Sequence, residues 1–429
     1  MLHRLLKLSS GVALLSGLFA VVFLRGLPRW QTMPLWAEDG NVFLWDTFQF
    51  GWKSFFHFYA GYYHLFPRLM ILLLSSISLQ YLAHLIFLCS LGLFCLVAFE
   101  FSRERYANVL PDRITRVFLS FAFCFTPGLS ENLGNLGNAH WFLSLYLCLL
   151  LIRNRDNALS AFDWLMVILA AFSAGECLLF IPMAFLRGYW VKSDRTVAWG
   201  IAAIIGAGVI LNLFAKHETI ADLPTLQKMV EAYFYSLVTQ LWIHPFFGDE
   251  IAYRVGDTAP VFWLLVILFA ASLWATFRIH TLENRLLFLF VVGASLYPIL
   301  YGSVRPDGLR FWSTMRRDPG LSIQRQSYLM GVAGLLYVVN LFSNLAEQKP
   351  ILKPLPIVFM ILYVALALPH FGVHTHDPKY RWDDQIAWHR EHSTQEILMM
   401  VAPFGWEVPV PPGAYQKVTL FDRLCGLRS

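Results

Sequence analysis

Two adjacent carboxylates, Glu38 and Asp39, are the residues of this sequence best suited to chemistry. They lie in residues 35–40 (LWAEDG), just beyond a first hydrophobic segment, in a chain of which only 14% of the residues are charged. Acids beside hydrophobic spans cost free energy to desolvate, which favours a catalytic or ligand-binding role. A positioned carboxylate can act as a general base, and a cap on the following helix is the structural alternative. Asp46, one or two turns further along, is the substitute candidate.

The elements that must position these acids are membrane spans. Hydrophobic residues make up 57% of the 429 positions, a proportion that excludes a soluble globular protein. The 37 Phe, 17 Tyr and 15 Trp fit interfacial aromatic belts, and the dispersed net charge of +5 does not indicate nucleic-acid binding. The apolar runs predict an all-α polytopic membrane protein with about 11 transmembrane helices. These helices are placed near residues 9–26, 79–101, 115–128, 140–152, 163–175, 177–190, 197–214, 261–279, 285–302, 327–344 and 355–371.

Several of these predicted spans have features of their own. The third to the sixth are short for a full crossing, so they predict two tight hairpins that are tilted or broken. The first span starts with basic residues, as a signal peptide does. Its long apolar run and the lack of a small-residue cleavage site nevertheless predict a retained helix. Pro28, Arg29 and Trp30 follow it and are typical of an anchor at the membrane interface.

Basic residues predict the orientation, because short cytoplasmic loops carry an excess of Lys and Arg. Every second predicted loop is basic, with contributions from Arg4, Lys7, Arg103, Arg105, Arg113, Arg116, Arg153, Arg155, Arg187, Lys192, Arg195, Arg278, Arg285, Lys349 and Lys353. This pattern places the N-terminus in the cytoplasm and the C-terminus outside. The predicted organisation is a transmembrane bundle over 1–371 with outer loops 27–78, 215–260 and 303–326 that form a cap. An outer tail over 372–429 packs on this cap.

The first outer loop has an amphipathic pattern. Residues 42–58 mix aromatic and aliphatic side chains with polar ones, which indicates one or two short interfacial helices. A second aromatic run over 59–68 leads into the apolar stretch 69–78. The structural alternative for most of these aromatic residues is anchoring at the interface.

In this arrangement the chain resembles the GT-C superfamily of integral-membrane glycosyltransferases, which use polyprenyl-phosphate-linked sugars. The resemblance rests on the first span, the acidic pair that opens an outer loop, the two interfacial helices after it and the remaining large outer loops. It covers the topology of most of the chain, although its motif is short. Within this superfamily the chain resembles bacterial multi-spanning transferases that decorate lipopolysaccharide O-antigen or related surface polymers.

The resemblance implies an inverting transfer in the bacterial inner membrane, with the active site on the periplasmic face. The donor would be a polyprenyl-phosphate-linked sugar and the acceptor a surface glycan or a lipid-linked glycan. One of the acids Glu38, Asp39 or Asp46 would take the proton of the acceptor hydroxyl as its oxygen attacks the anomeric carbon. A lipid phosphate would leave, and it needs cationic partners on the outer side.

Several residues could supply the site for the donor phosphate, namely Arg325, Tyr328, Arg310, Arg68 and His64. Members of look-alike families often have an Arg-Tyr pair at the start of the tenth span. Here Gln326 and Ser327 separate Arg325 from Tyr328. The alternative for the basic loop 303–326 is binding of anionic lipid head groups.

Two further groups are candidates for binding the sugar or the acceptor. The first comprises Asn132, Asn135, Asn138, His140 and Trp141. Amides at a spacing of three share one face of a helix or turn, and together with His and Trp they suit hydrogen bonding and ring stacking with sugars. The second candidate is Glu176, an acid at the tip of a predicted hairpin. For the Asn-rich run, ordinary turn chemistry is the alternative.

The sequence indicates no cofactor. The six Cys residues show no CxxC spacing, and the chain has no Gly-rich nucleotide-binding signature. His374, His376 and Asp377 in the tail are typical of solvated surface, so no metal site is predicted and dependence on a divalent metal stays open. Two other functions remain as alternatives: a flippase or transporter of a lipid-linked saccharide, and an O-antigen polymerase or ligase.

Overall fold

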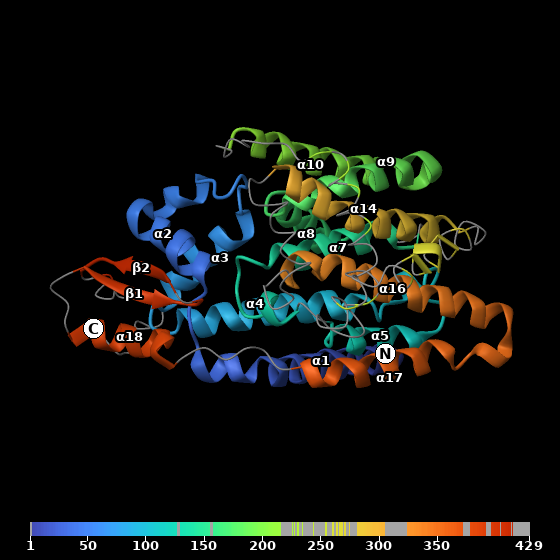
Figure 1. Ribbon diagram of the computed structural model, residues 1–429, viewed down its shortest axis with the longest axis horizontal. Helices are drawn as coiled ribbons and strands as arrows, with labels where there is room; N and C mark the ends of the chain where they lie inside the picture. The colour runs from blue at the N-terminus through green and yellow to red at the C-terminus, as the bar shows by residue number, and fades with distance from the viewer. Residues whose placement is uncertain are drawn as a thin grey trace.

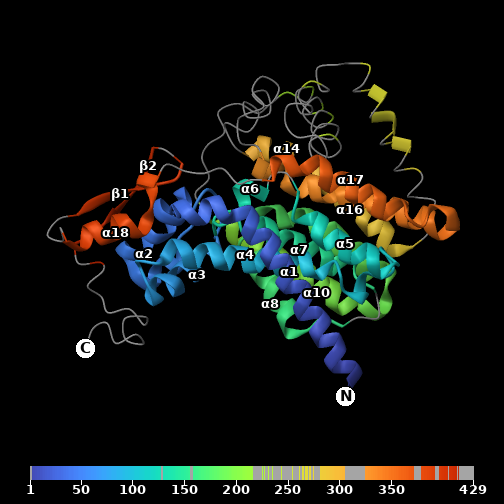
Figure 2. The same cartoon turned by 90° about the horizontal axis from the view of Figure 1, so that it is seen from below.

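The architecture was analysed in a computed structural model. It describes residues 2–126, 129–154, 158–215, 281–304, 324–371, 378–391, 396–403, 405–412 and 414, with isolated positions between 225 and 274. Most of the helices run along the long axis of the molecule (Figure 1). In a second view the N-terminal end of the first helix projects from the body (Figure 2).

The fold is mostly helical. The α-helices are α1 (Leu2–Thr32), α2 (Trp45–Phe50), α3 (Leu65–Ile77), α4 (Leu82–Glu100), α5 (Arg113–Phe123), α6 (Leu129–Asn132), α7 (His140–Ile152), α8 (Ala161–Ala171), α9 (Ile181–Trp190), α10 (Arg195–Leu213), α14 (Leu282–Val304), α16 (Gln324–Gln348), α17 (Leu355–Ala367) and α18 (Trp382–Glu391). A π-helix, η1 (Glu38–Leu44), carries the acid pair. Short 3-10 turns are η2 (Gly51–Phe56), η3 (Glu104–Tyr106), η4 (Gly175–Phe180), η5 (Lys192–Asp194), η7 (Pro350–Leu352), η8 (Leu368–His370) and η9 (Pro378–Tyr380).

Five helical segments in the described part of the chain are long and apolar enough to cross a membrane. They are Ser10–Thr32, Leu82–Glu100, Lys192–Leu213, Tyr328–Gln348 and Pro350–Ala367. A sixth is counted if α8 and the segment Gly175–Trp190, which are bent by 117° at a short break, form one span. The prediction of several long apolar helices is confirmed, and the described residues contain five or six candidate spans, fewer than the 11 predicted.

The short apolar runs account for most of this difference. They form α5, α7, α8 and α9, which have 11, 13, 11 and 10 residues. At about 1.5 Å per residue, each covers only about 15–20 Å of a hydrocarbon core that is about 30 Å thick. In α7 every residue after His140 is buried, so its apolarity serves packing inside the protein. The predicted span near 261–279 lies largely outside the described residues.

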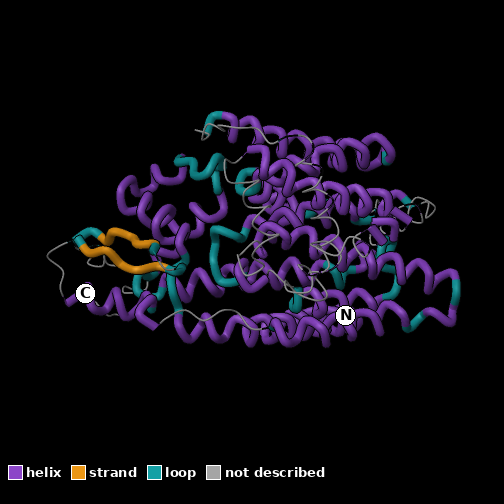
Figure 3. The backbone as a smooth tube through the Cα atoms, viewed as in Figure 1, coloured by secondary structure: helices purple, strands orange, loops and turns teal. Residues whose placement is uncertain are grey.

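A small β-hairpin departs from the predicted all-α class. Strands β1 (Ile397–Val401) and β2 (Trp406–Val410) pair antiparallel, with Ile397 opposite Val410 and Val401 opposite Trp406. This hairpin, α18, α2 and α3 lie together at one end of the molecule (Figures 1 and 3). Strand β2 belongs to the Pro-containing run that begins at Ala402, and it is paired despite Pro409.

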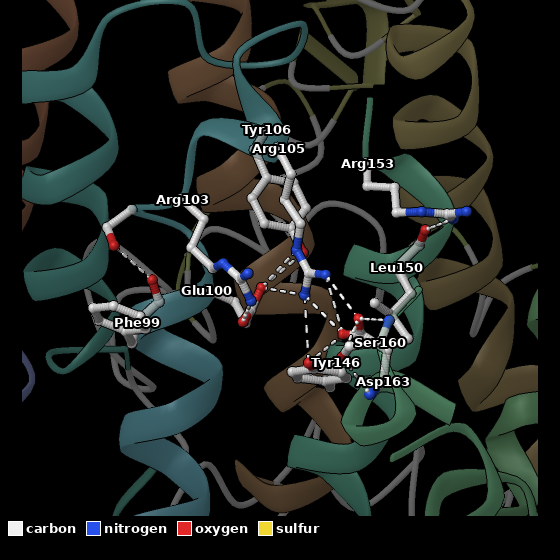
Figure 4. Close-up of polar contacts among 11 residues, drawn as sticks. Phe99, Glu100, Arg103, Arg105, Tyr106, Tyr146, Leu150, Arg153, Ser160 and Asp163 are labelled. Atoms are coloured by element: carbon white, nitrogen blue, oxygen red, sulfur yellow. Dashed lines mark hydrogen bonds and ion pairs between the residues drawn. The ribbon is translucent and has the colours of Figure 1, made fainter. Parts of the chain in front are cut away.

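A network of buried charges joins α4, α7 and α8 at the other end of α4 (Figure 4). Arg105, which is 6% exposed, donates hydrogen bonds to Glu100 (Nε to Oε2, 2.9 Å) and to Asp163 (Nη1 to Oδ1, 3.1 Å). The hydroxyl of Tyr146 donates to the same Asp163 oxygen at 2.7 Å. The network ties the C-terminal end of α4 to the N-terminal turn of α8.

Other arginines that carried the predicted orientation are also buried. Arg153 and Arg187 both bind Asp194, and Arg116 donates to the carbonyl oxygen of Leu110. An arginine whose charge is paired inside the protein does not indicate which side of the membrane its loop faces. The cytoplasmic N-terminus therefore stays a prediction.

We expect Arg105→Ala to lower the free energy of unfolding by about 3–5 kcal/mol, because removal of one partner leaves a buried charge uncompensated. Arg103→Ala is the matched control. Arg103 also binds Glu100, at 2.7 Å, but its side chain is 47% exposed, so its loss should cost about 1 kcal/mol or less. Denaturation of both variants in detergent micelles measures the difference. Equal costs would show that burial does not determine the strength of these pairs.

Candidate functional site

The acid pair lies on η1, against the turn between α6 and α7. Asp39 is fully buried, and its carboxylate accepts hydrogen bonds from the backbone N–H groups of Gly137 (2.8 Å) and Leu136 (3.0 Å). Glu38 is partly exposed and contacts the same turn: a Cβ atom on Gly137 would lie 3.4 Å from the Cβ of Glu38. The two neighbouring acids therefore have different environments, one enclosed and one open.

The environment of Asp39 changes its acidity. Burial raises the pKa of Asp39 to about 7, against the opposing effect of the two backbone hydrogen bonds. This value includes two smaller effects, since the neighbouring Glu38 charge raises the pKa and Arg29 lowers it. A carboxyl group with a pKa near 7 can exchange a proton at physiological pH.

Asparagine side chains build the turn that holds Asp39. The side-chain oxygen of Asn135 accepts from the backbone N–H of Asn138 at 2.8 Å, and its amide donates to the Glu131 carbonyl oxygen at 2.7 Å. The amide of Asn138 donates to the same oxygen at 3.3 Å. Gly134 takes a positive φ of 82°, which glycine adopts without strain. Asn132 is buried beside this turn. These contacts match the turn alternative for Asn135 and Asn138.

The C-terminal hairpin covers the other side of η1. The backbone N–H of Ala37 donates to the Ala402 carbonyl oxygen at 2.6 Å, and the N–H of Ala402 donates to Leu35 at 2.9 Å. A Cβ atom on Gly40 would lie only 2.8 Å from the side chain of Val401, so the close approach requires glycine. The chain between α1 and α2 is thus enclosed by two segments that are remote in sequence.

Arg29 is a residue of this site that the sequence did not reveal. It was predicted to anchor α1 at the membrane interface, but it is only 3% exposed. Its guanidinium donates to the carbonyl oxygen of Leu133 and stacks 4.7 Å over the ring of Trp36. Both contacts position segments that flank Asp39. The available signal was the spacing of Arg25 and Arg29, which puts both on one face of α1.

Arg68 is the most enclosed cation of the first outer loop, at 2% exposure. Its Nη1 donates to Asp46 Oδ2 at 2.8 Å and to the Ser54 carbonyl oxygen at 3.0 Å. Its Nε and Nη2 atoms, which form the side-on edge of the guanidinium, are buried without a hydrogen-bond partner. The guanidinium lies 5.3 Å over the ring of Phe43, one turn beyond the acid pair on η1.

Aromatic rings surround His64. Its ring centroid lies 5.4 Å from that of Phe43, 5.8 Å from that of Tyr59 and 5.6 Å from that of Tyr62. The ring of Tyr62 packs directly on Gly175, where a Cβ atom would lie 2.3 Å from it. The aromatic run after η2 therefore reaches the break between α8 and α9.

Glu176 and His140 form a pair at this break. His140 Nδ1 lies 2.7 Å from Glu176 Oε1, and the hydroxyl of Ser144 donates to the same oxygen at 2.9 Å. The side chain of Glu176 is 2% exposed and that of His140 is 15% exposed. The ring of His140 stacks on Trp141 at 4.5 Å. The buried carboxylate orients the imidazole of His140 through its Nδ1 atom.

These contacts bring most of the predicted site residues together. The acids of η1, the Asn turn, the His140–Glu176 pair and the aromatic rings around His64 make a continuous set of contacts. Tyr328 lies elsewhere on α16, between the rings of Phe123 (6.1 Å) and Phe142 (5.7 Å). Arg310 and the side chain of Arg325 lie outside the described residues.

Within the described residues, no group of three or more His, Cys, Asp or Glu side chains could hold a metal ion. Comparison of the chain with known protein families, with characterised proteins and with solved structures finds no match.

We expect the stability of the protein to fall as the pH rises from about 4, the pKa of Asp in an unfolded chain, to about 7. Between these two pH values Asp39 is deprotonated in the unfolded chain but still protonated in the folded protein. Each rise in pH therefore favours the unfolded chain, and the free energy of unfolding levels off above pH 7. Asp39→Asn should flatten this fall, as measured by thermal unfolding at a series of pH values. Asp384→Asn, at a side chain that is 69% exposed, should leave the wild-type profile unchanged. An unaltered profile in Asp39→Asn would contradict the assignment.

Proposed function

We propose that this chain is a polytopic membrane glycosyltransferase that uses a polyprenyl-phosphate-linked sugar donor. The sugar passes, with inversion, to a surface glycan or to a lipid-linked acceptor on the outer face of the cell inner membrane. One observation carries the proposal: the acid pair and a buried arginine with an unpaired guanidinium edge share η1 as their common support. Transfer from a phosphate ester needs both a proton acceptor and a cation of this kind.

In this proposal Glu38 is the general base. Its side chain is partly exposed, whereas both oxygens of Asp39 accept backbone hydrogen bonds and the residue is fully buried. Glu38 takes the proton of the acceptor hydroxyl as the oxygen bonds to the anomeric carbon of the sugar. The bond from that carbon to the phosphate oxygen breaks, and the lipid phosphate leaves with the electron pair. Asp39 fixes the backbone of η1 so that Glu38 faces the acceptor.

Arg68 receives the donor phosphate in the same proposal. The Nε and Nη2 atoms of a guanidinium bind two oxygens of a phosphate side by side, and these are the atoms that lack a partner. Asp46 binds the opposite edge through Nη1, so its role is to position Arg68. The ring of His64 lies 5.4 Å from that of Phe43, and His64 is the second proposed contact for the phosphate.

The His140–Glu176 pair is the proposed acceptor site. A histidine held by a buried carboxylate presents one ring nitrogen as a hydrogen-bond partner for a sugar hydroxyl. Trp141 lies beside it and suits stacking on a sugar ring. The Asn turn positions both this pair and the acid pair, because Asn138 lies two residues before His140.

A flippase of lipid-linked saccharides is the second candidate, and the bend between α8 and the segment Gly175–Trp190 favours it. The two helical segments meet at 117°, and transporters place their substrates at helices broken in this way. Glu176 lies at the break, with its carboxylate bound to His140. Movement of a labelled lipid between leaflets by the wild-type protein, without sugar transfer, would favour this reading.

We expect Glu38→Gln to lower the rate of sugar transfer by about 10²–10⁴-fold, the usual contribution of a general base. The assay uses purified protein in nanodiscs, a panel of polyprenyl-phosphate sugars and a surface-glycan acceptor, and it also records donor binding. Binding should persist, because the amide keeps the shape of the side chain. Glu407→Gln is the matched control, since Glu407 is an exposed acid on the hairpin that covers the same segment.

The other outcomes of this assay separate the roles of the acids. If Asp39→Asn abolishes transfer and Glu38→Gln does not, the two acids exchange roles. If both variants keep the full rate, the acid pair is structural and the proposal is wrong. A wild-type protein that binds none of the donors and transfers no sugar also contradicts it.

A further inference from the structure

Arg25 is a buried cation inside a helix of membrane-spanning character. It lies in the apolar segment Ser10–Thr32 of α1 and is 1% exposed, whereas its neighbour Leu24 is 61% exposed. Its Nη1 donates to the carbonyl oxygen of Cys124 at 2.5 Å, at the C-terminal end of α5. Its Nε atom is buried without a hydrogen-bond partner. An ionisable residue at this depth normally has a functional partner.

The surroundings of Arg25 differ from those of the other buried arginines. Arg105, Arg153 and Arg187 bind carboxylates directly, and so does Arg68. Arg29, one turn further along α1, lies near Asp39 and Glu131. The charged or ionisable groups near Arg25 in the described residues are Tyr363, Cys124 and Tyr328, none of which is a carboxylate. The positive charge thus has no anionic partner in this part of the protein.

The hydroxyl of Tyr328 provides a second donor at the same place. Tyr328 is 1% exposed, it lies near Arg25, and its hydroxyl is buried without a hydrogen-bond partner. Its ring is held between Phe123 and Phe142, so the hydroxyl has a defined position. The guanidinium of Arg25 lies 5.5 Å from the centre of the Phe371 ring. Two unsatisfied donors, one of them charged, share a site enclosed by α1, α5, α16 and α17.

We propose that Arg25 and Tyr328 form a binding site for the phosphate group of a membrane lipid. A guanidinium and a phenol hydroxyl both donate to phosphate oxygens, and the phosphate charge supplies the missing counter-ion. A lipid is the source that fits, because the site lies within an apolar span whose neighbouring side chains face outward. The site is separate from the edge of Arg68 and does not depend on sugar transfer, since a polyprenyl phosphate or an anionic phospholipid can each fill it.

The structural alternative is that Arg25 serves only the C-terminal end of α5. Helix carbonyl groups carry a partial negative charge, and an arginine near them stabilises the helix. The two roles predict opposite effects of removing the charge. If Arg25 stabilises α5, its removal lowers the free energy of unfolding. If Arg25 binds a ligand, its unpaired charge destabilises the ligand-free protein, and its removal does not lower the free energy of unfolding.

The test compares Arg25→Met with wild type in nanodiscs of phosphatidylcholine alone, and then with undecaprenyl phosphate or phosphatidylglycerol added. Thermal unfolding and native mass spectrometry measure stability and bound lipid. We expect Arg25→Met to unfold at the wild-type temperature or above it in phosphatidylcholine. It should also lose the stabilisation that the added phosphate lipid gives to wild type. Tyr328→Phe keeps the ring and should bind the lipid about tenfold more weakly, as expected for one hydrogen bond to a charged group.

Arg29→Met is the matched control, because Arg29 lies on the same face of α1 and has a carboxylate nearby. It should unfold at a lower temperature and keep the stabilisation by the lipid. The proposal is overturned if Arg25→Met unfolds at a lower temperature in phosphatidylcholine and still responds to the phosphate lipids. A response of wild type to inorganic phosphate alone, with none to the lipids, also overturns it. The two lipid arms show which class of phosphate lipid binds.

Discussion

A charge enclosed by apolar helices needs a partner, and this constraint organises both ends of the molecule. Desolvation of an isolated ion inside a protein is too costly for a fold of ordinary stability. Around Glu100 and Asp163 the solution is an arginine placed between two carboxylates, and it joins three helices that are otherwise held by apolar contacts. At the opposite end, Asp39 is enclosed without a direct ion pair, and two backbone N–H groups take that place.

The hydrogen bonds from backbone N–H groups to Asp39 explain the structure of the turn between α6 and α7. Backbone amides can point at a carboxylate only if the turn that carries them is rigid and leaves them unpaired. The side chains of Asn135 and Asn138 satisfy the other polar groups of that turn, which leaves the N–H groups of Leu136 and Gly137 to Asp39. The hairpin contacts the opposite side of this segment through the backbone of Ala402. The raised pKa of Asp39, the Asn-built turn and the contact with the hairpin are thus features of one enclosed segment.

The positions of the helices followed from the sequence, whereas their number of membrane crossings did not. Hydropathy detects an apolar run, but it does not distinguish a helix that faces lipid from one such as α7, which is enclosed by protein. Likewise, the positive-inside rule counts every arginine in a loop, including Arg105 and Arg153, whose charges are paired with buried acids. The hairpin was missed because its two strands are short, because Pro403 and Pro409 interrupt the run after Ala402, and because the hairpin packs on residues 35–37, far away in the chain.

The candidate site was predictable as a set of residue types and not as an arrangement. The acid pair, His140 and Arg68 stand out in sequence because charged residues are rare in this chain. Which of the two adjacent acids is exposed depends on the rotation of η1, and a π-helix turns by a different angle per residue from the α-helix that the sequence pattern assumes. The pairing of His140 with Glu176 depends on the sharp break after α8, for which Gly175 was the only local signal.

Helix α1 connects the two unusual arginines to the acid pair. Arg25 and Arg29 are one turn apart, and each donates to a backbone carbonyl oxygen of the chain between α5 and α7, at Cys124 and at Leu133. That same stretch of chain presents the amides that hold Asp39. The segment formed by α1 and η1 is therefore held to this stretch at three points, two on α1 and one on η1, and the point at Arg25 lacks a nearby acid in the described chain. An anion at Arg25 would add the missing charge at the point where this arrangement is electrostatically incomplete, while leaving the hydrogen bonds around Asp39 as they are.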